Sequence, residues 1–278
     1  MQDLAFNLEY LENSETHLSK GVFCIFEDGN TVGFVDSFVT NFKRFDEFWA
    51  KQGDPIYIGS YEGVPYFAQE VQSGTAAQND LETYSLRVVA EKDEFIFAIQ
   101  SRAIQLLNWR KNHRFCGICG SKTQSSSQEH AMRCEACEKN FYPKIMPCVM
   151  ALVIQGDKCL LAKHAGRGRG TLTALAGFVE AGESAEQAIY REVLEEVGIK
   201  TGRQQYFSSQ SWSFPGQLML AYFVEYREGD IRLEEEEIAE ASWFSAAEIM
   251  GLENIPADYT ISGKLIRAFA RGDYQPFN

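Results

Sequence analysis

Residues 177–199 read GFVEAGESAEQAIYREVLEEVGI, and their pattern predicts one capped helix around which the fold is organised. Ser184 followed by Gln187 is typical of a capping box, in which a hydroxyl and an amide pair with free backbone N–H groups at a helix N-terminus. Gly198 suits the helix end, because glycine adopts the left-handed conformation without a steric penalty. An apolar stripe recurs every fourth residue, at Ile189, Val193 and Val197. The stripe predicts that one face of this helix packs against a core.

Three glutamates share another face of the predicted helix. Glu192, Glu195 and Glu196 stand at i, i+3 and i+4, where like charges repel by about a few tenths of a kcal/mol per pair. Acidic clusters of oxygen ligands are what hard divalent cations such as Mg²⁺ require. A solvated acidic face is the alternative, and for an isolated REVLEE segment it would be the better interpretation.

The spacing of the whole stretch is far more specific than this acidic face. Gly177, five residues, Glu183, seven residues and the segment 191–199 match every fixed position of the pattern GX5EX7REUXEEXGU, with U aliphatic. The chain therefore resembles the Nudix hydrolases, which cleave a nucleoside diphosphate linked to another moiety. The resemblance implies an α/β/α sandwich and a catalytic site that holds two or three Mg²⁺ or Mn²⁺ ions.

Length and composition predict several folded units and an acidic surface. The chain has 278 residues, of which 45% are hydrophobic, and a net charge of −13. This length exceeds one small domain, so two or three units are expected. The acidity argues against a surface that coats nucleic acid or an anionic membrane, although a local basic pocket for phosphates is compatible with it.

Neither a membrane segment nor a secretory signal is expected. The longest apolar run, 145–154, has about half of the ~20 residues that a membrane helix needs, and it is interpreted as a buried strand. Residues 1–10 lack the basic and hydrophobic regions of a signal peptide. Four of the seven cysteines are spaced for metal and not for disulfides, which favours a reducing, cytoplasmic setting.

Residues 1–110 are expected to form a separate mixed α/β domain. Candidate strands are apolar runs separated by Gly, Asp and Asn, at 21–27, 31–35, 55–61, 64–70 and 85–90. The apolar period changes to that of a helix between Glu94 and Trp109. This region carries no catalytic signature, so its expected role is that of a scaffold or of a domain that shapes the substrate site.

Residues 111–143 are expected to form a zinc ribbon. Two CxxC pairs, separated by fourteen residues, supply Cys116, Cys119, Cys134 and Cys137. Four thiolates can surround one Zn²⁺ at ~2.3 Å and leave no open position, which predicts a structural ion. A redox CxxC is the alternative, and the pairing of two such motifs disfavours it. The remaining cysteines lie in apolar runs and are expected to be buried packing residues, namely Cys24, Cys148 and Cys159.

Residues 144–278 are expected to form the Nudix domain. Two apolar strands, 146–154 and 158–164, would make a hairpin across Gly156–Asp157. Further elements are a segment at 171–178 that leads into the stretch at 177–199, strands at 217–226 and 241–244, and a helix at 261–270. The expected fold class is therefore α+β, with a Nudix α/β/α sandwich preceded by a zinc ribbon and a mixed α/β N-terminal domain.

A turn-rich stretch after the helix, residues 209–217, reads SQSWSFPGQ and narrows the substrate. We expect a loop that offers ring faces to a base, and a loop whose Trp packs on the core is the alternative. The stretch resembles the SQPWPFPxS array of Nudix proteins of the NADH pyrophosphatase type, which also have a four-cysteine ribbon and an N-terminal domain. The resemblance assigns substrate contacts to Gln210, Ser211, Trp212, Ser213, Phe214, Pro215, Gly216 and Gln217. Serines at 211 and 213 replace prolines and Gln217 replaces the last serine, which loosens the loop and puts strict substrate preference in doubt.

The same resemblance assigns further substrate contacts. Phe178 would stack on a base, and three residues, Tyr142, Glu129 and Ser262, would line the pocket. Arg87, expected in the last strand of the N-terminal domain, would approach a substrate phosphate across a dimer. Each of these residues has a structural role as the alternative.

The resemblance also assigns the metal site. The ligands would be the carboxylates of Glu192, Glu196 and Glu237 and the backbone carbonyl of Ala176. Glu237 lies in the acidic run 234–237, for which a solvated turn is the alternative interpretation. Glu195 would be a further ligand or a hydrogen-bond partner of the site's water. Arg191 would orient the carboxylates through charge-assisted hydrogen bonds, and Glu183 would be a base or an anchor for the ligands.

The function implied by the resemblance is hydrolysis of the pyrophosphate bond of NADH or NAD⁺ to nicotinamide mononucleotide and AMP. The NAD cap of an RNA 5′ end contains the same dinucleotide, and the resemblance suggests a homodimer. One alternative is another Nudix diphosphatase, acting on ADP-ribose or a dinucleoside polyphosphate. A second alternative is a non-catalytic nucleotide sensor, against which the intact carboxylate set argues.

Overall fold

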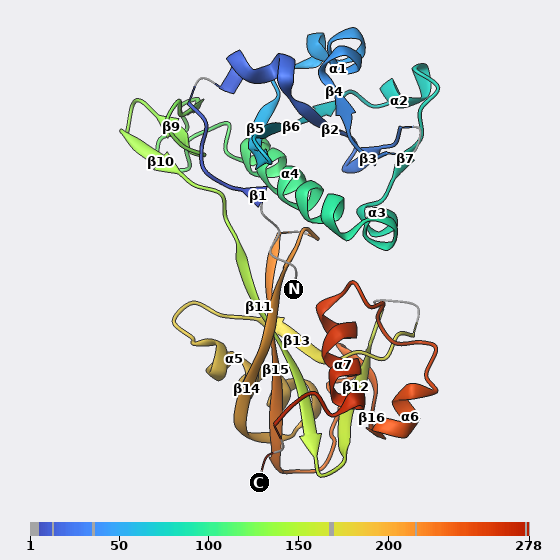
Figure 1. Ribbon diagram of the computed structural model, residues 1–278. Coiled ribbons are helices and arrows are strands. Elements are labelled where there is room, and N and C mark those ends of the chain that lie inside the picture. Colours follow the sequence, from blue (N-terminus) through green and yellow to red (C-terminus); the bar gives the residue numbers. More distant parts are fainter. Residues whose placement is uncertain are drawn as a thin grey trace. The chain divides into compact units, whose positions relative to one another are not determined.

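The computed structural model describes residues 6–12, 14–34, 37–166, 170–214, 216–275 and 277 (Figure 1). The chain forms two compact units, unit 1 (Met1–Lys144) and unit 2 (Ile145–Asn278). The finer division of residues 1–144 into an N-terminal domain and a zinc ribbon at 110/111 stays a prediction. Within the described ranges, none of the helices combines the length and the apolar character that crossing a membrane requires.

Unit 1 contains a sheet with the strand order β1-β5-β6-β2-β3-β7, and β4 pairs with β2 beside this path. The strands are β1 (Phe6–Asn7), β2 (Val22–Glu27), β3 (Asn30–Val32), β4 (Thr40–Asn41), β5 (Ile56–Tyr61), β6 (Val64–Val71) and β7 (Thr83–Tyr84). β2 and β6 run parallel at the centre, and both are almost fully buried. Aromatic rings fill the core beside them, with Phe23 stacked on Phe45 at a centroid distance of 3.9 Å.

The helices of unit 1 correct one prediction. They are the 3₁₀ helices η1 (Ser14–Lys20) and η2 (Ala50–Gln52), and α1 (Phe42–Phe48), α2 (Thr75–Gln78), α3 (Leu86–Lys92) and α4 (Glu94–Asn112). The expected strand at 85–90 is wrong, because these residues begin α3. Leu86, Val89 and Ala90 are buried at helical spacing, which an apolar run of six residues does not distinguish from a strand. The strand expected at 31–35 ends at Val32, and Val35 lies outside the described residues.

The rest of unit 1 is a small three-stranded sheet of order β10-β9-β8. Its strands are β8 (Gln124–Ser125), β9 (Met132–Cys134) and β10 (Lys139–Phe141). The two CxxC pairs lie around these strands, and the sheet places the pairs next to each other. The predicted helix at 94–109 is confirmed by α4. Asp93 caps its N-terminus, where the Asp93 carboxylate accepts from the N–H of Ile96.

Unit 2 contains a sheet of order β14-β15-β11-β12-β16, with β13 paired to β11. The strands are β11 (Met146–Gln155), β12 (Lys158–His164), β13 (Leu175–Phe178), β14 (Lys200–Trp212), β15 (Gln217–Glu228) and β16 (Ile238–Ser245). The predicted hairpin between β11 and β12 is confirmed, since Gln155 pairs with Lys158 across Gly156–Asp157. β11 is central, running parallel to β15 and antiparallel to β13.

Two hydrophobic cores lie on opposite faces of this sheet. α5 (Ala185–Val197) covers one face, α7 (Ile261–Arg271) covers the other, and the short α6 (Ala246–Met250) follows β16 (Figure 1). Side chains of β11 alternate between the two cores, as the period of two in a strand requires. Even-numbered residues such as Leu152 pack with α7, whereas odd-numbered residues such as Val153 pack with α5. This arrangement is the expected α/β/α sandwich.

The stretch at 209–217 is a correction to the predicted loop. Residues 209–212 are the end of the long strand β14, and Trp212 pairs with Gln217, the first residue of β15. The two strands therefore take up more of this stretch than predicted, as far as Trp212 and again from Gln217. The prediction failed because polar serines and glutamines dominate this part of the strand, and only pairing along β15 makes the segment extended.

Candidate active site

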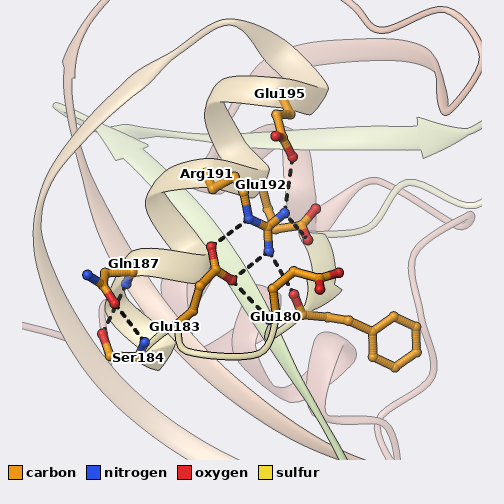
Figure 2. A network of polar contacts seen from close by, with 8 residues as sticks. Glu180, Glu183, Ser184, Gln187, Arg191, Glu192 and Glu195 are labelled. Atoms are coloured by element: carbon orange, nitrogen blue, oxygen red, sulfur yellow. Dashed lines mark hydrogen bonds and ion pairs between the residues drawn. The ribbon is translucent and has the colours of Figure 1, made fainter.

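α5 presents the acidic face of the site, and its ends have the predicted caps. Gln187 donates its N–H to the Ser184 hydroxyl at 3.3 Å, and Ser184 donates its N–H to the Gln187 side-chain oxygen at 2.8 Å (Figure 2). Gly198 ends the helix in the left-handed conformation with φ 73°. The apolar stripe is fully buried. These contacts fix the rotation of α5, and so they fix where its glutamates point.

Glu196 is the most buried carboxylate of this face. Its residue is 3% exposed, and its Oε2 atom is buried without a hydrogen-bond partner among the described residues. Burial, and then the negative charges of Glu192, Glu237 and Glu195 in that order, raise the pKa of Glu196 to about 8. An ionised carboxylate in such a place is unfavourable unless a cation compensates it. The donor set is oxygen-rich and anionic, which fits a hard divalent cation.

Glu192 lies against the backbone of β13 at Gly177. A Cβ atom added at Gly177 would lie 1.8 Å from the carboxyl carbon of Glu192, so the carboxylate would have to move. The glycine that opens the pattern therefore leaves room for a carboxylate from α5 in this position. Burial raises the pKa of Glu192, and its hydrogen bond with Arg191 opposes this effect.

Arg191 connects the carboxylates to each other. It donates to both oxygens of Glu183, at 2.7 and 2.8 Å, and one Nη also donates to Glu192 at 2.7 Å and to Glu195 at 3.0 Å (Figure 2). Its other Nη donates to the carbonyl of Phe178 at 2.9 Å. Such charge-assisted, forked contacts hold planar groups in fixed positions. Arg191 therefore orients the acidic face and also holds it against the end of β13.

Glu183 is held from two sides. Besides the guanidinium, the backbone N–H of Glu180 donates to Glu183 Oε2 at 3.0 Å (Figure 2). The hydrogen bonds from Arg191 and then from Glu180 lower the pKa of Glu183 to about 2. A carboxylate so strongly stabilised in its charged form is a weak base. The geometry therefore favours the anchor over the base among the two predicted roles.

Glu237 and Ala176 reach the same region from other elements. Glu237 ends the turn before β16, and its charge contributes to the raised pKa of both Glu192 and Glu196. Its backbone carbonyl accepts from the N–H of Ala165 at 2.7 Å, which fixes the turn. Ala176 lies on β13 opposite Met150. The acidic run is thus a turn whose last member approaches the carboxylates of α5.

The 209–217 stretch has more structural contacts than predicted. The side-chain amide of Gln210 donates to the carbonyl of Tyr259 at 2.7 Å and accepts from the N–H of Ile261 at 2.7 Å. Gln210 therefore holds the start of α7. Ser262 is 5% exposed and its hydroxyl contacts that of Thr173 at 2.7 Å, so it is a buried residue of the same junction.

The remaining members of the stretch surround the turn between β14 and β15. The rings of Trp212 and Phe214 meet edge to face at a centroid distance of 5.3 Å, and Trp212 packs on the core under α7. Ser211 is exposed and Ser213 is buried. Gly216 is buried and accepts from the N–H of Met146. Pro215 lies outside the described residues. The alternative interpretation, a Trp that packs on the core, thus describes Trp212.

Unit 1 contains three of the predicted substrate contacts, and two of them lie close together beside the sheet β10-β9-β8. Tyr142 donates its hydroxyl to Glu129 at 3.0 Å, and Asn140 donates to the same oxygen at 3.0 Å. Half of the Tyr142 residue is exposed. Arg87 is exposed on α3 and not on a strand. In unit 2 Phe178 is 43% exposed at the end of β13, so its ring is accessible to a ligand.

The four cysteines of the CxxC pairs form one compact cluster. Their sulfur atoms all lie within 4.8 Å of one another. The backbone N–H of Ile118 donates to Cys116 at 3.4 Å, a contact that stabilises a thiolate. As expected, the cysteines of the apolar runs are buried, and these are Cys24, Cys148 and Cys159.

Comparison with known proteins supports both the acidic site of unit 2 and the cysteine cluster of unit 1. The NUDIX domain model matches residues 144–269, and the NADH pyrophosphatase zinc ribbon domain model matches residues 111–142. Curated proteins described as NAD-capped RNA hydrolase NudC, from Shigella boydii serotype 18 and Escherichia coli strain K12 / DH10B, are 37% identical over 223 residues. The alignments cover 79% of this chain and 83% of each relative. The chain belongs to the Nudix hydrolase family.

The structural comparison gives the same fold for this Nudix hydrolase. A crystal structure described as a NUDIX hydrolase from Nitrosomonas europaea has a TM-score of 0.50, and the match covers 59% of this chain and 94% of that one. At 22% identity this similarity establishes the fold alone. The ribbon match and the cysteine cluster together support one structural Zn²⁺ in unit 1.

Sequence reasoning missed several residues that build the site. Phe178 contributes its carbonyl as well as its ring, and Glu180 contributes a backbone N–H. The fixed number of residues between Gly177 and Glu183 was a signal of a loop with a defined shape. Cys148 is buried near the acidic face, where burial and then the charges of Glu192 and Glu196 raise its pKa to about 12. Its position in an apolar run gave no sign of this neighbourhood.

Proposed function

We propose that this Nudix hydrolase cleaves the pyrophosphate bond of NADH and NAD⁺ with the help of divalent cations. Water adds to one phosphorus and the bridging P–O bond breaks, which gives AMP and nicotinamide mononucleotide, reduced or oxidised as in the substrate. The observation that carries the proposal is the buried, unpartnered carboxylate oxygen of Glu196 within an acidic face. The substrate is supported by the 37% identity to NAD-capped RNA hydrolases over most of the chain.

The residues that would hold Mg²⁺ or Mn²⁺ are those with oxygens directed to this face. They are Glu192, Glu196 and Glu237, with the carbonyl of Ala176 and with Glu195 as a further ligand. Bound cations would neutralise the charge of the diphosphate and of the leaving phosphate. Glu196 has a buried oxygen without a hydrogen-bond partner among the described residues, whereas both oxygens of Glu183 are engaged by Arg191 and Glu180. We therefore assign anchoring to Glu183.

Arg191 acts through the carboxylates and not on the substrate. Its donors are directed to Glu183, Glu192, Glu195 and the Phe178 carbonyl. Because it also bonds to the residue beside Gly177, it ties the position of the Phe178 ring to that of the acidic face. Phe178 would stack on a base of the dinucleotide, which is compatible with its exposure.

The other substrate contacts of the proposal come from both units. In unit 2 they are members of the 209–217 stretch, in which Gln210 holds the start of α7, and Ser262, whose hydroxyl contacts that of Thr173. In unit 1 the linked pair Tyr142 and Glu129 would contribute a ring and a carboxylate, with Arg87 approaching a phosphate in a homodimer. The same site would accept the NAD cap of RNA, since that cap is the same dinucleotide with a chain attached.

The test is a product analysis with NADH, NAD⁺, ADP-ribose and a diadenosine polyphosphate, each with Mg²⁺ or Mn²⁺ and without. AMP and nicotinamide mononucleotide, formed fastest from the NAD substrates and only with cations, are the expected result. Faster turnover of ADP-ribose or of the diadenosine polyphosphate would agree with diphosphatase activity but would refute NADH and NAD⁺ as the preferred substrates. A Glu196→Gln variant should lose turnover and keep measurable dinucleotide binding. If the unmodified protein binds these compounds but hydrolyses none of them, the protein is a non-catalytic nucleotide sensor and the proposed activity is wrong.

A further inference from the structure

Unit 1 contains a cavity, and of the residues that line it only Glu129 is among the substrate contacts of the proposed reaction. Its volume is about 950 Å³, near the upper end of the range of roughly 300–1,000 Å³ found for small-molecule sites. One wall comes from β5, β6 and the C-terminal end of α4, and the facing wall comes from residues 122–132 of the small sheet. The cavity therefore lies inside unit 1, where the first sheet and the cysteine-bearing sheet meet.

Specific contacts hold these two walls together. His130 contacts the carbonyl of Tyr57 at 2.7 Å, and Tyr10 donates its hydroxyl to the carbonyl of Ser126 at 3.2 Å. The rings of Tyr10 and His130 meet edge to face at 5.3 Å. Burial lowers the pKa of His130, so at neutral pH its ring joins the walls without adding charge. The cavity is thus a fixed feature of unit 1.

Three of the cations that line this cavity have no carboxylate partner among the described residues. Arg110 comes from α4, Arg114 follows that helix, and Lys122 comes from the facing wall. None of the three forms a salt bridge with a carboxylate in the part of the chain that the structure describes. A fourth cation, Lys111, is paired with Glu70 at 3.2 Å. In a protein with a net charge of −13, such a group of unpaired cations indicates a place for an anion.

Arg110 has unused donors in a partly desolvated place. It donates one hydrogen bond, from Nη2 to the carbonyl of Asp54 at 2.9 Å, whereas a guanidinium has five N–H donors. Burial lowers the pKa of Arg110, and the carboxylates of Asp54 and Glu70 oppose this effect. An arginine that loses hydration without an ion pair gains most from a ligand that accepts two hydrogen bonds, as a phosphate does.

The carboxylates and polar groups of the lining agree with this interpretation. Glu70 is occupied by Lys111, Glu129 accepts from two neighbours, and Asp54 is exposed to solvent, which screens its charge. Two buried polar atoms of the lining, Gln69 Oε1 and Trp109 Nε1, have no partner among the described residues. Buried polar atoms are normally satisfied by protein, water or a ligand. The lining is therefore suited to a polar ligand.

We propose that this cavity binds a small phosphate-bearing ligand of nucleotide size, with Arg110, Arg114 and Lys122 contacting its phosphate. The volume exceeds what inorganic phosphate fills, so the rest of the ligand occupies the space toward Tyr57 and Trp109. Nucleoside monophosphates have this chemistry and size. All the residues that line this cavity belong to unit 1, and the proposal does not depend on the hydrolase activity.

The proposal is tested by charge reversal with a matched control. R114E/K122E reverses two exposed cations of the cavity, and K20E/K43E makes the same charge change at exposed positions of unit 1 that do not line it. Titration calorimetry with AMP, without added divalent cations, should show binding that R114E/K122E weakens at least about tenfold and the control leaves within about twofold. The neutral pair R114Q/K122Q should give an intermediate loss, and melting temperatures verify that each variant is folded.

Three further probes separate phosphate recognition from other binding. Adenosine should bind much more weakly than AMP, and inorganic phosphate should bind detectably and lose affinity in R114E/K122E. Equal affinity for adenosine and AMP would overturn the proposal. So would the absence of AMP binding by the unmodified protein, an equal loss in both reversal pairs, or binding that neither pair changes.

Discussion

Replacing Glu196 by glutamine should stabilise the cation-free protein at high pH, even though it removes a residue of the proposed catalytic site. Glu196 is 3% exposed, and its pKa is raised from 4.5 to about 8. Between these two values the folded state holds a proton that the unfolded state has released. The folded state binds more protons, so the free energy of unfolding falls as pH rises through this window. Glutamine carries no charge and avoids this loss.

The expected magnitude follows from the size of the shift. One pKa unit corresponds to about 1.4 kcal/mol. The glutamine variant should therefore gain roughly 4 kcal/mol relative to the unmodified protein at pH 8, roughly 3 kcal/mol at pH 7 and under about 1 kcal/mol at pH 5. These values are upper estimates, because the substituted amide loses some packing and the protein relaxes around a buried charge.

Hydrogen exchange of peptides that cover 185–197 is the suitable assay, since the chain has two units and a single unfolding transition is not expected. Glu195→Gln is the matched control on the same helix, because the Glu195 side chain is 60% exposed. Added Mg²⁺ should protect the unmodified protein and leave Glu196→Gln unchanged. A glutamine variant that is no more protected than the unmodified protein at pH 8 without cations would refute the argument that Glu196 is a buried, uncompensated carboxylate.

Three further predictions concern how the site is held. Gly177→Ala should lower kcat at least about tenfold with a small change in melting temperature, because its Cβ would displace the Glu192 carboxylate. Arg191→Lys should lower kcat by about tenfold or more, since an ammonium cannot keep the forked contact with Glu183; steady-state kinetics of both variants measure this. Gln210→Ala should lower the free energy of unfolding by about 1–3 kcal/mol, because the N–H at the start of α7 loses its partner; hydrogen exchange of α7 measures it.

Matched variants distinguish these effects from general damage. Gly251→Ala adds a Cβ that meets no atom closer than 3.5 Å, and it should leave kcat unchanged. Gln205→Ala removes an exposed 3.3 Å hydrogen bond to the N–H of Gln275 and should leave α7 protection unchanged. An unaltered kcat in Gly177→Ala would show that catalysis does not depend on the position of the Glu192 carboxylate beside β13. Wild-type activity in Arg191→Lys would show that the fork is not required.

Much of the fold followed from local patterns. The capped helix at 185–197, the hairpin at 156–157 and the helix at 94–109 each depend on caps, turns and periods that nearby residues specify. The segments that failed are those where local preference is weak. Residues 86–90 fit either a helix or a strand, and residues 209–212 are polar and extended only because β15 pairs with them.

Sequence spacing determined which residues of this Nudix hydrolase carry chemistry, because both the glutamates of α5 and the two CxxC pairs are close along the chain. The tertiary structure decided what those residues experience. It buried Glu196 and left one of its oxygens without a partner among the described residues, placed Glu192 in the space above Gly177, engaged Gln210 with α7 and brought three cations to the lining of one cavity. The physical reason is that local spacing fixes which side chains share a face, whereas burial, charge and hydrogen-bond partners come from segments distant in sequence.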